Sequence, residues 1–545
     1  MVFAFDHPHD QPPRELISLL GGKGAGLAEM TTVLGLPVPA GFTVGVPMCR
    51  MYREGGWPEG LDALLEEHCR ALEERMGRRF GDPADPLLLA VRSGAARSMP
   101  GMLDTVLNLG LNPASVAGLA GVSGDERFAW ESYRRFVTMY ATTVLGVPAE
   151  VVRPRAEDGE GRQTVDKLSV DGLRAEVDGI ISALAREGVA IPEEPAAQLR
   201  GAVEAVFRSW ESPRARAYRA REGISEDLGT AVNVQAMVFG NLGHDSGTGV
   251  VFTRNPSTGE SAPFGDFLLR AQGEEVVAGT AQTQSIDSMA ELLPGAYDEL
   301  RRHLRRLEVH YRDICDVEFT VERGRLWILQ TRVGKRGAVA AVRAAVEMVD
   351  DPLIRLTTQE AVARVPHEVR DRARDEILAW GRQGSGTVSP VAVGLGASPG
   401  RATGTVVLDA DAAAMSDGPV ILVRPETSPE DVAGMSVSVG ILTSTGGMVS
   451  HAAVVARGWG IPAVVGAECL TIGPDEVRDR DGTLVFAAGD TITVDGTSGE
   501  VWLGAPEETS AGSTESDEEI LGRHLPQLGQ LESWAGASAV PVPEA

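Results

Sequence analysis

Residues 445–458 read Thr445-Gly446-Gly447-Met448-Val449-Ser450-His451-Ala452-Ala453-Val454-Val455-Ala456-Arg457-Gly458. They predict a short apolar helix that begins at His451, is capped by Ser450 and ends at Gly458. The glycine pair lets the backbone approach a ligand closely, because glycine has no Cβ. The positive end of the helix dipole favours a neutral imidazole and offers N–H groups to a phosphate. The segment predicts a histidine that attacks phosphorus and then carries a phosphoryl group, although a lone histidine more often only caps a core helix.

The composition narrows the class of protein. Lysine and arginine total 50 against 77 aspartates and glutamates in 545 residues, a formal charge of −27. This acidic balance argues against a nucleic-acid or anionic-membrane partner. No apolar run is long enough to span a membrane, and the N-terminus does not resemble a signal peptide. The cysteines have no disulfide or metal-site spacing, so a soluble cytoplasmic protein is expected; they are Cys49, Cys69, Cys315 and Cys469.

The order of segments predicts an α/β and α+β multidomain protein. Residues 1–337 alternate strand-like and helix-like segments, with a charged, helical and peripheral insertion over 154–198. Residues 338–390 predict a helical linker that ends in a flexible joint at 381–389. Residues 391–505 predict a second, β/α domain around the His451 helix, because short β-branched runs flank it. Residues 506–545 are acidic and rich in small side chains, which predicts a disordered tail.

Three glycine- or arginine-rich segments of the first domain suit phosphate chemistry. Residues 20–30 place Lys23 among glycines, but the spacing is not that of a P-loop, and a plain turn explains the segment equally well. In residues 91–105 a predicted strand ends at Arg92 and is followed by a loop of arginines and serines; such a loop suits phosphate oxygens, or is simply solvated. Residues 247–260 predict an apolar strand that delivers Thr253 and Arg254 to a turn.

Residues 316–332 predict a β-hairpin with the three-residue loop Glu322-Arg323-Gly324. That loop pairs Val321 with Arg325, and strand alternation then gives two faces. The polar face holds Asp316, Glu318, Gln330 and Arg332, and the core face holds Val317, Phe319, Trp327 and Leu329. Two carboxylates can hold Mg²⁺ on a nucleotide while an arginine stabilises the transferred group. The plainer alternative is a solvated face with a surface ion pair.

Taken together, these segments resemble the family of pyruvate, phosphate dikinase and phosphoenolpyruvate synthase, from about Leu19 to about Gly504. The resemblance implies an ATP-grasp-type nucleotide-binding unit followed by a small swivelling phosphohistidine domain, with ATP as ligand and Mg²⁺ as cofactor. It implies ATP contacts from Lys23, Arg92, Thr253, Arg254, Glu274, Asp316 and Gln330. It implies metal ligation by Asp316 and Glu318, and catalysis by His451, Arg332 and Glu318.

The same resemblance implies a reaction. His451 attacks the β-phosphorus of ATP and releases AMP, while inorganic phosphate or water takes the terminal phosphoryl group. The family's C-terminal barrel is not recognised in residues 505–545, so the expected acceptor is pyruvate on a separate barrel protein or another small molecule. Val449 stands where the family commonly has threonine, and valine has no hydroxyl to be phosphorylated.

Two other hypotheses remain open on the sequence. The chain could be a non-catalytic nucleotide-binding or regulatory remnant, or an independent dikinase that acts on a different small molecule. A homodimer is left open as well.

Overall fold

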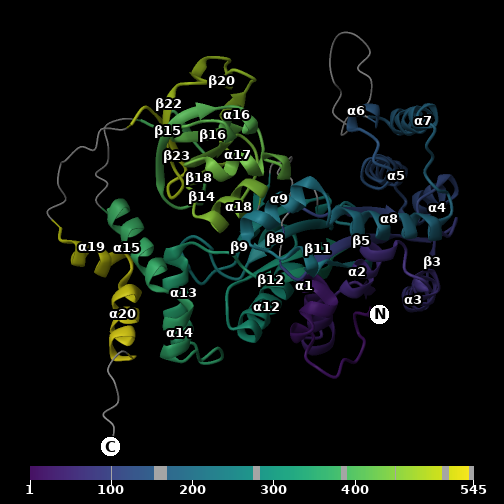
Figure 1. The fold of residues 1–545 in the computed structure, drawn as a ribbon, viewed down its shortest axis with the longest axis horizontal. Coiled ribbons are helices and arrows are strands. Elements are labelled where there is room, and N and C mark those ends of the chain that lie inside the picture. The colour runs from purple at the N-terminus through teal and green to yellow at the C-terminus, as the bar shows by residue number, and fades with distance from the viewer. Residues whose placement is uncertain are drawn as a thin grey trace, which may run out of the picture. The chain divides into compact units, whose positions relative to one another are not determined.

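The structure, a computed structural model, describes residues 1–97, 99, 101–152, 168–273, 283–381, 389–448, 450–505 and 515–538 (Figure 1). The chain is a mixed α/β protein of two compact units. The first comprises residues 1–244 and 327–330, and the second comprises residues 245–326 and 331–545. No helix within the described ranges is long and apolar enough to cross a membrane.

The first unit is built on a five-stranded sheet. Its strand order is β1 (Val2–Ala4), β2 (Gly41–Val44), β7 (Thr230–Ala236), β5 (Leu89–Ala95) and β6 (Thr105–Leu109). Every residue of β7 is buried, so both faces of the sheet are covered at its centre. Helices α1 (Ile17–Ala28) and α8 (Pro195–Ser209) both pack against β5 and β7.

The remaining elements of this unit, all but α9 (Pro213–Glu222), contribute residues to one hydrophobic core. They are α2 (Val46–Gly55), α3 (Leu61–Met76), β3 (Arg79–Phe80), β4 (Pro86–Leu87), α4 (Pro113–Ser123), α5 (Glu126–Met139), α6 (Ala149–Val152) and α7 (Val170–Arg186). Helix α7 contributes Val177, Ile180 and Leu184 to the core. The expectation that residues 154–198 form a peripheral insertion is therefore wrong for α7, because the apolar stripe of this amphipathic helix is buried.

Another five-stranded sheet belongs to the second unit, except for residues 327–330 of its last strand. Its order is β10 (Gln284–Ser285), β9 (Phe264–Leu269), β8 (Gly247–Phe252), β11 (Cys315–Glu322) and β12 (Arg325–Val333). Strands β8 and β11 are antiparallel, in a register that runs from Phe252 opposite Asp316 to Gly247 opposite Val321. Helix α12 (Pro294–Tyr311) packs against β11 and follows the short α11 (Met289–Leu292).

The turn between β11 and β12 differs from the predicted one. Only Arg323 and Gly324 separate the strands, and both have positive φ, 48° and 75°. This is the geometry of a two-residue type I′ turn, whose twist matches that of the flanking strands. The predicted three-residue loop is wrong because arginine rarely adopts a left-handed conformation, so Arg-Gly gives a weak turn signal.

A shift of one residue exchanges the two faces of a strand. In β12 the fully buried side chains are accordingly Leu326 and Ile328, while the predicted core residues Trp327 and Leu329 are half-buried. The predicted core residues of β11, Val317 and Phe319, are fully buried.

Residues 391–505 contain an eight-stranded sheet. Its order is β13 (Ala392–Val393), β23 (Glu500–Leu503), β22 (Thr491–Asp495), β15 (Arg401–Val407), β16 (Val420–Arg424), β17 (Gly440–Thr443), β18 (Ala463–Val465) and β14 (Leu395–Ser398). Strands β15 to β18 are parallel neighbours. Successive residues of β16 enter different cores: Ile421 and Val423 enter one, and Val420 and Leu422 the other.

Each face of that sheet therefore packs against different elements and forms a separate hydrophobic core. Helix α18 (His451–Trp459) contributes to one core, and the small sheet of β19 (Leu470–Ile472), β20 (Glu476–Asp479) and β21 (Leu484–Ala487) contributes to the other. Two short helices, α16 (Ala410–Ala414) and α17 (Val432–Val437), pack against each other. The strands predicted on either side of the histidine helix are all present.

Five helices form a separate bundle within the second unit. Helices α13 (Ala338–Asp350), α14 (Thr358–Arg364) and α15 (His367–Gly381) pack with α19 (Asp517–His524) and α20 (Pro526–Ser538) (Figure 1). The disordered tail predicted for 506–545 is therefore wrong over 517–538. The prediction rested on the acidic composition and did not take account of two local signals. A capping box at Ser516 begins α19. Four apolar residues enter the bundle core: Ile520, Leu525, Leu528 and Leu531.

Candidate functional site

His451 is the first residue of α18, where the sequence predicts it. The Ser450 hydroxyl accepts a hydrogen bond from the Ala453 N–H at 3.4 Å and caps the helix. The helix runs to Trp459 and ends in a left-handed Gly460 with φ 68°, so the predicted end at Gly458 is wrong by about one residue.

The two ring nitrogens of His451 have different surroundings. Nδ1 lies 3.1 Å from the Thr427 hydroxyl oxygen. Nε2 is buried and has no hydrogen-bond partner among the described residues. Burial lowers the pKa of His451 to about 4, although Asp431 opposes the shift. The direction agrees with the effect expected from the helix dipole, but burial is the main cause. His451 is therefore neutral at pH 7, and one of its two ring nitrogens carries a lone pair.

Thr427 belongs to a turn that sequence reasoning missed. It lies within residues 426–431, which are separated from β16 by Pro425 and read Glu-Thr-Ser-Pro-Glu-Asp. Ser428 and Asp431 form a capping box, and Asp431 also lies 3.4 Å from Arg424. The signal that could have found the turn was this capping pattern at the end of a parallel strand, where sites often form.

The β11–β12 hairpin brings Asp316 and Arg332 together. Arg332 Nε donates to both carboxylate oxygens of Asp316, at 2.8 and 2.7 Å. Burial raises the pKa of Asp316, and Arg332 partly offsets this effect. The Asp316 charge, followed by Glu318, raises the pKa of Arg332. Glu318 lies two residues after Asp316 on β11 and is half-buried. Arg332 thus pairs with Asp316 and interacts with Glu318. The predicted shared face of the four residues is wrong, because the one-residue shift puts Gln330 and Arg332 on the same side of β12 as Leu326 and Ile328.

Gln330 is on β12 and is 8% exposed. Its amide oxygen is buried and has no hydrogen-bond partner among the described residues. A buried acceptor of this kind needs a donor or an ion, because an unmade hydrogen bond costs about 1–3 kcal/mol.

The residues fit a magnesium ion that is also held by phosphates. Within the described ranges no group of three or more His, Cys, Asp or Glu side chains is arranged so that it could hold a metal ion by itself. Mg²⁺ is commonly held by only one or two carboxylates together with phosphate oxygens and water. Asp316 and Glu318 supply two carboxylates of that kind.

Lys23 and Arg92 lie in the first unit, on neighbouring elements. Gly21 interrupts the start of α1 with φ 68° and ψ 169°, and a Cβ there would overlap the Gly94 carbonyl oxygen of β5. The close approach places the Lys23 Cβ 3.3 Å from where a Cβ of Gly94 would lie. Arg92 is on the same strand, opposite Asn233 of β7. Both side chains are half-buried.

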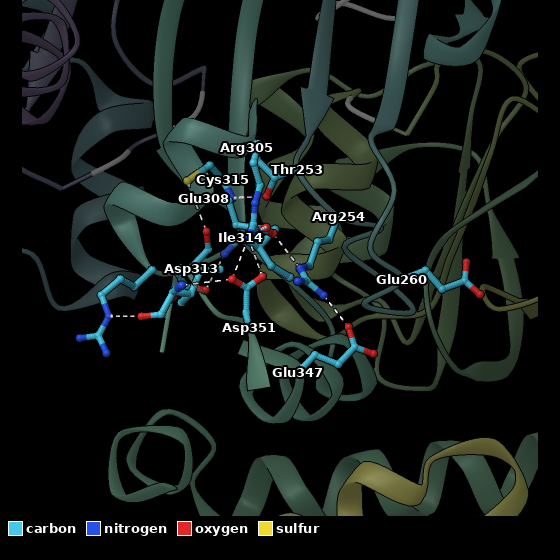
Figure 2. Close-up of polar contacts among 12 residues, drawn as sticks. Thr253, Arg254, Glu260, Arg305, Glu308, Asp313, Ile314, Cys315, Glu347 and Asp351 are labelled. Atoms are coloured by element: carbon cyan, nitrogen blue, oxygen red, sulfur yellow. Dashed lines mark hydrogen bonds and ion pairs between the residues drawn. The ribbon is translucent and has the colours of Figure 1, made fainter. Parts of the chain in front are cut away.

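Thr253 and Arg254 are occupied by structural contacts. Cys315 N–H donates to the Thr253 hydroxyl at 3.1 Å. Arg254 is 3% exposed and points toward two carboxylates (Figure 2), with Nε 2.7 Å from Glu308 and Nη1 2.6 Å from Glu347. These ion pairs tie the end of β8 to α12 and α13. The structure thus places Arg254 in an ion-pair network.

Some predicted residues cannot be placed. Glu274 and the side chain of Val449 lie outside the described residues, as do Ser98 and Pro100 of the Arg92 loop and most of the joint at 381–389.

Two families match the chain. Residues 54–296 and 288–351 match the family described as pyruvate phosphate dikinase, AMP/ATP-binding domain. Residues 416–499, which include His451, match the family described as PEP-utilising enzyme, mobile domain.

Among curated relatives, a pyruvate, phosphate dikinase of Rhizobium meliloti (strain 1021) is 48% identical over 92% of this chain and 58% of its own length. A pyruvate, phosphate dikinase of Clostridium symbiosum is 46% identical over 92% of this chain and 58% of its own length. A chloroplastic pyruvate, phosphate dikinase of Zea mays is 46% identical over 92% of this chain and 53% of its own length. The chain thus spans little more than half the length of these relatives. Among solved structures, an Enzyme I (nEIt) protein aligns with a TM-score of 0.14 at 16% identity over 36% of this chain and 72% of that chain, too low to carry an argument.

Proposed function

The chain belongs to the pyruvate, phosphate dikinase family, and on that premise we propose that it uses Mg-ATP to phosphorylate its own His451 and passes the group to an acceptor. The observation that carries the proposal is the buried, neutral imidazole whose Nε2 has no partner at the start of a helix. Such a nitrogen is a competent nucleophile, and the helix N-terminus can stabilise the phosphate once bound.

In the proposed step, Nδ1–H of His451 donates to the Thr427 hydroxyl oxygen, and this tautomer leaves the lone pair on Nε2. Nε2 attacks the β-phosphorus, an N–P bond forms, and the bond from that phosphorus to the oxygen of AMP breaks. Inorganic phosphate or water then takes the terminal phosphoryl group. The phosphohistidine that remains is the donor for the final acceptor.

The hairpin supports the proposed nucleotide chemistry. Asp316 and Glu318 would hold Mg²⁺, which when bound neutralises charge on the phosphates. Arg332 would stabilise the negative charge that develops on the transferred group. Gln330 would accept a hydrogen bond at the nucleotide through its unpartnered amide oxygen. Lys23 and Arg92 are proposed phosphate contacts on the family resemblance. Thr253 and Arg254 are left out, because their polar groups are engaged in structural contacts.

We also propose the functional division expected from the sequence. Residues 1–337 form the ATP-grasp-type nucleotide-binding part, 338–390 the linker and 391–505 a swivelling phosphohistidine domain. The relatives are named pyruvate, phosphate dikinase, so pyruvate and phosphate are the first acceptors to test, whether pyruvate is held by a partner barrel or elsewhere. A homodimer and a cytoplasmic location stay predictions.

The test is incubation with ATP labelled at the β-phosphorus. We expect acid-labile label on the protein together with AMP, and no label on His451→Asn. His367→Asn is the matched control, because His367 is an exposed histidine on α15. Absence of label on the unmodified protein, or its persistence in His451→Asn, would overturn the proposal. ATP binding by calorimetry without AMP formation would instead favour a non-catalytic, regulatory role.

A further inference from the structure

Arg457 is a buried cation that the proposed chemistry does not use. It lies on α18, six positions after His451, and is only 5% exposed. Its Nη1 donates to the Ala397 carbonyl of β14 at 2.9 Å, and its Nη2 donates to the Met448 carbonyl in the loop before His451. The guanidinium therefore fixes the loop that presents the histidine.

The charge of Arg457 is not compensated within residues 391–505. Among the described residues it makes no ion pair within 4.0 Å, and its Nε has no hydrogen-bond partner. Burial lowers the pKa of Arg457 to about 10, and the groups that oppose this shift are Asp316 and Asp266. These carboxylates lie on β11 and β9, in the sheet that carries Arg332. An isolated buried charge is costly, so the carboxylates of this sheet stabilise the buried guanidinium.

Three further contacts join the histidine domain to the same sheet, all within the second unit. The Arg457 guanidinium carbon lies 5.4 Å from the ring centroid of Phe252 on β8. Phe264 of β9 packs against the apolar core of α18. A Cβ added to Gly447 would overlap the Asp266 carboxylate, so this glycine permits the close approach of the loop.

We propose that Arg457 is a positioning residue that links the His451 loop to the sheet carrying Asp316, so that the histidine is held for reaction with nucleotide while its domain rests on that sheet. The guanidinium donates to the Met448 carbonyl of the loop. Its positive charge is stabilised by the carboxylates of Asp316 and Asp266 on the sheet. The proposal deepens the proposed function and rests on it for its kinetic test.

The test compares Arg457→Met, Arg457→Lys and a control, Arg401→Met. Arg401 is in the same domain, 3.1 Å from Asp495 and 4.9 Å from the Trp502 ring centroid, and touches neither the loop nor the sheet contacts above. Each protein is labelled with ATP and, separately, with phosphoramidate, a small reagent that phosphorylates histidine without nucleotide. Melting temperatures are measured in parallel.

For Arg457→Met we expect ATP-dependent labelling to fall about tenfold or more, the loss corresponding to charge-assisted hydrogen bonds. Labelling by phosphoramidate should equal or exceed that of the unmodified protein. Arg457→Lys should recover part of the ATP-dependent rate, and Arg401→Met should label normally with both donors. Unchanged ATP labelling in Arg457→Met would overturn the proposal, as would an equal loss with both donors, which indicates a role in folding alone.

Hydrogen exchange separates this proposal from the proposed function. If the unmodified protein takes label from phosphoramidate but not from ATP, the proposed function fails. The link to the sheet is then decided by amide exchange in Arg457→Met. Faster exchange in both residues 440–460 and residues 264–269 supports it, and a change confined to 440–460 overturns it.

Discussion

At the scale of single residues, the two nitrogens of His451 are distinguished by Thr427. One nitrogen faces a hydroxyl and the other has no partner among the described residues. A hydroxyl can either donate to or accept from Nδ1, so the proposed attack by Nε2 requires the tautomer in which Nδ1–H donates to Thr427.

The first prediction concerns pH. The pKa of His451 is lowered from 6.5 to about 4, so the folded protein keeps the imidazole neutral as the pH falls through 6. ATP-dependent labelling should therefore show no titration near pH 6.5. The unfolded chain takes up the proton first, so the contribution of His451 to stability declines between pH 6.5 and about 4. An NMR titration of the imidazole nitrogens checks this, and a midpoint near 6.5 in the folded protein would contradict it.

The second prediction concerns Thr427. Thr427→Val keeps the shape of the side chain but removes the hydroxyl beside Nδ1, so the reactive tautomer loses its acceptor. We expect the labelling rate to fall by about tenfold, the value of one or two hydrogen bonds. Thr427→Ser, which keeps the hydroxyl, should label nearly normally. Equal rates in Thr427→Val and the unmodified protein would show that the hydroxyl does not orient the ring.

At the scale of elements, the ends of strands and helices are held by ion pairs as well as by apolar packing. The third prediction follows from Arg254, which joins β8 to α12 and α13 through Glu308 and Glu347. Arg254→Met leaves the buried Glu308 carboxylate without one of its cations, and we expect a loss of about 3–5 kcal/mol in unfolding free energy. Urea unfolding measures it.

The double variant Arg254→Met with Glu308→Leu is the control, because it removes both charges. It should be more stable than Arg254→Met alone. Strictly additive losses would show that the pair is not coupled.

The same scale shows what the sequence could predict. Short runs of β-branched residues predicted the strands around His451, because a strand that is buried on both faces is apolar at nearly every position. The β11–β12 hairpin was predicted as an element, and Asp316 and Arg332 do meet. Its register was not, because one residue in the turn decides which face each side chain of β12 takes, and Arg323 gives no strong turn signal. The contacts of Arg254 and Thr427 depend on residues far away in sequence, which no local pattern reveals.

At the scale of the whole chain, its C-terminal region is part of the fold. Leu528 and Leu531 are completely or almost completely buried in a bundle that contains α19 and the three helices of residues 338–381. The fourth prediction is that Leu528→Ala destabilises this bundle by about 2–5 kcal/mol. Thermal unfolding followed by circular dichroism measures the loss. Gln530→Ala, on the same helix, is the control, and equal effects of the two variants would contradict the packing.

The ion pair of Asp316 with Arg332 has a consequence for the order in which ligands arrive. Arg332 donates to both carboxylate oxygens of Asp316. A metal ion alone must therefore compete with Arg332 for Asp316, and a phosphate alone must compete with Asp316 for Arg332. A metal–nucleotide complex supplies a cation for Asp316 and an anion for Arg332 at the same time. The fifth prediction is therefore synergy: titration calorimetry should give a weaker affinity for Mg²⁺ without nucleotide than with it, by about 1–3 kcal/mol, and an equal gain for nucleotide when metal is present. Independent affinities would contradict it. The resting ion pair would thus favour joint binding of metal and nucleotide over binding of either one alone.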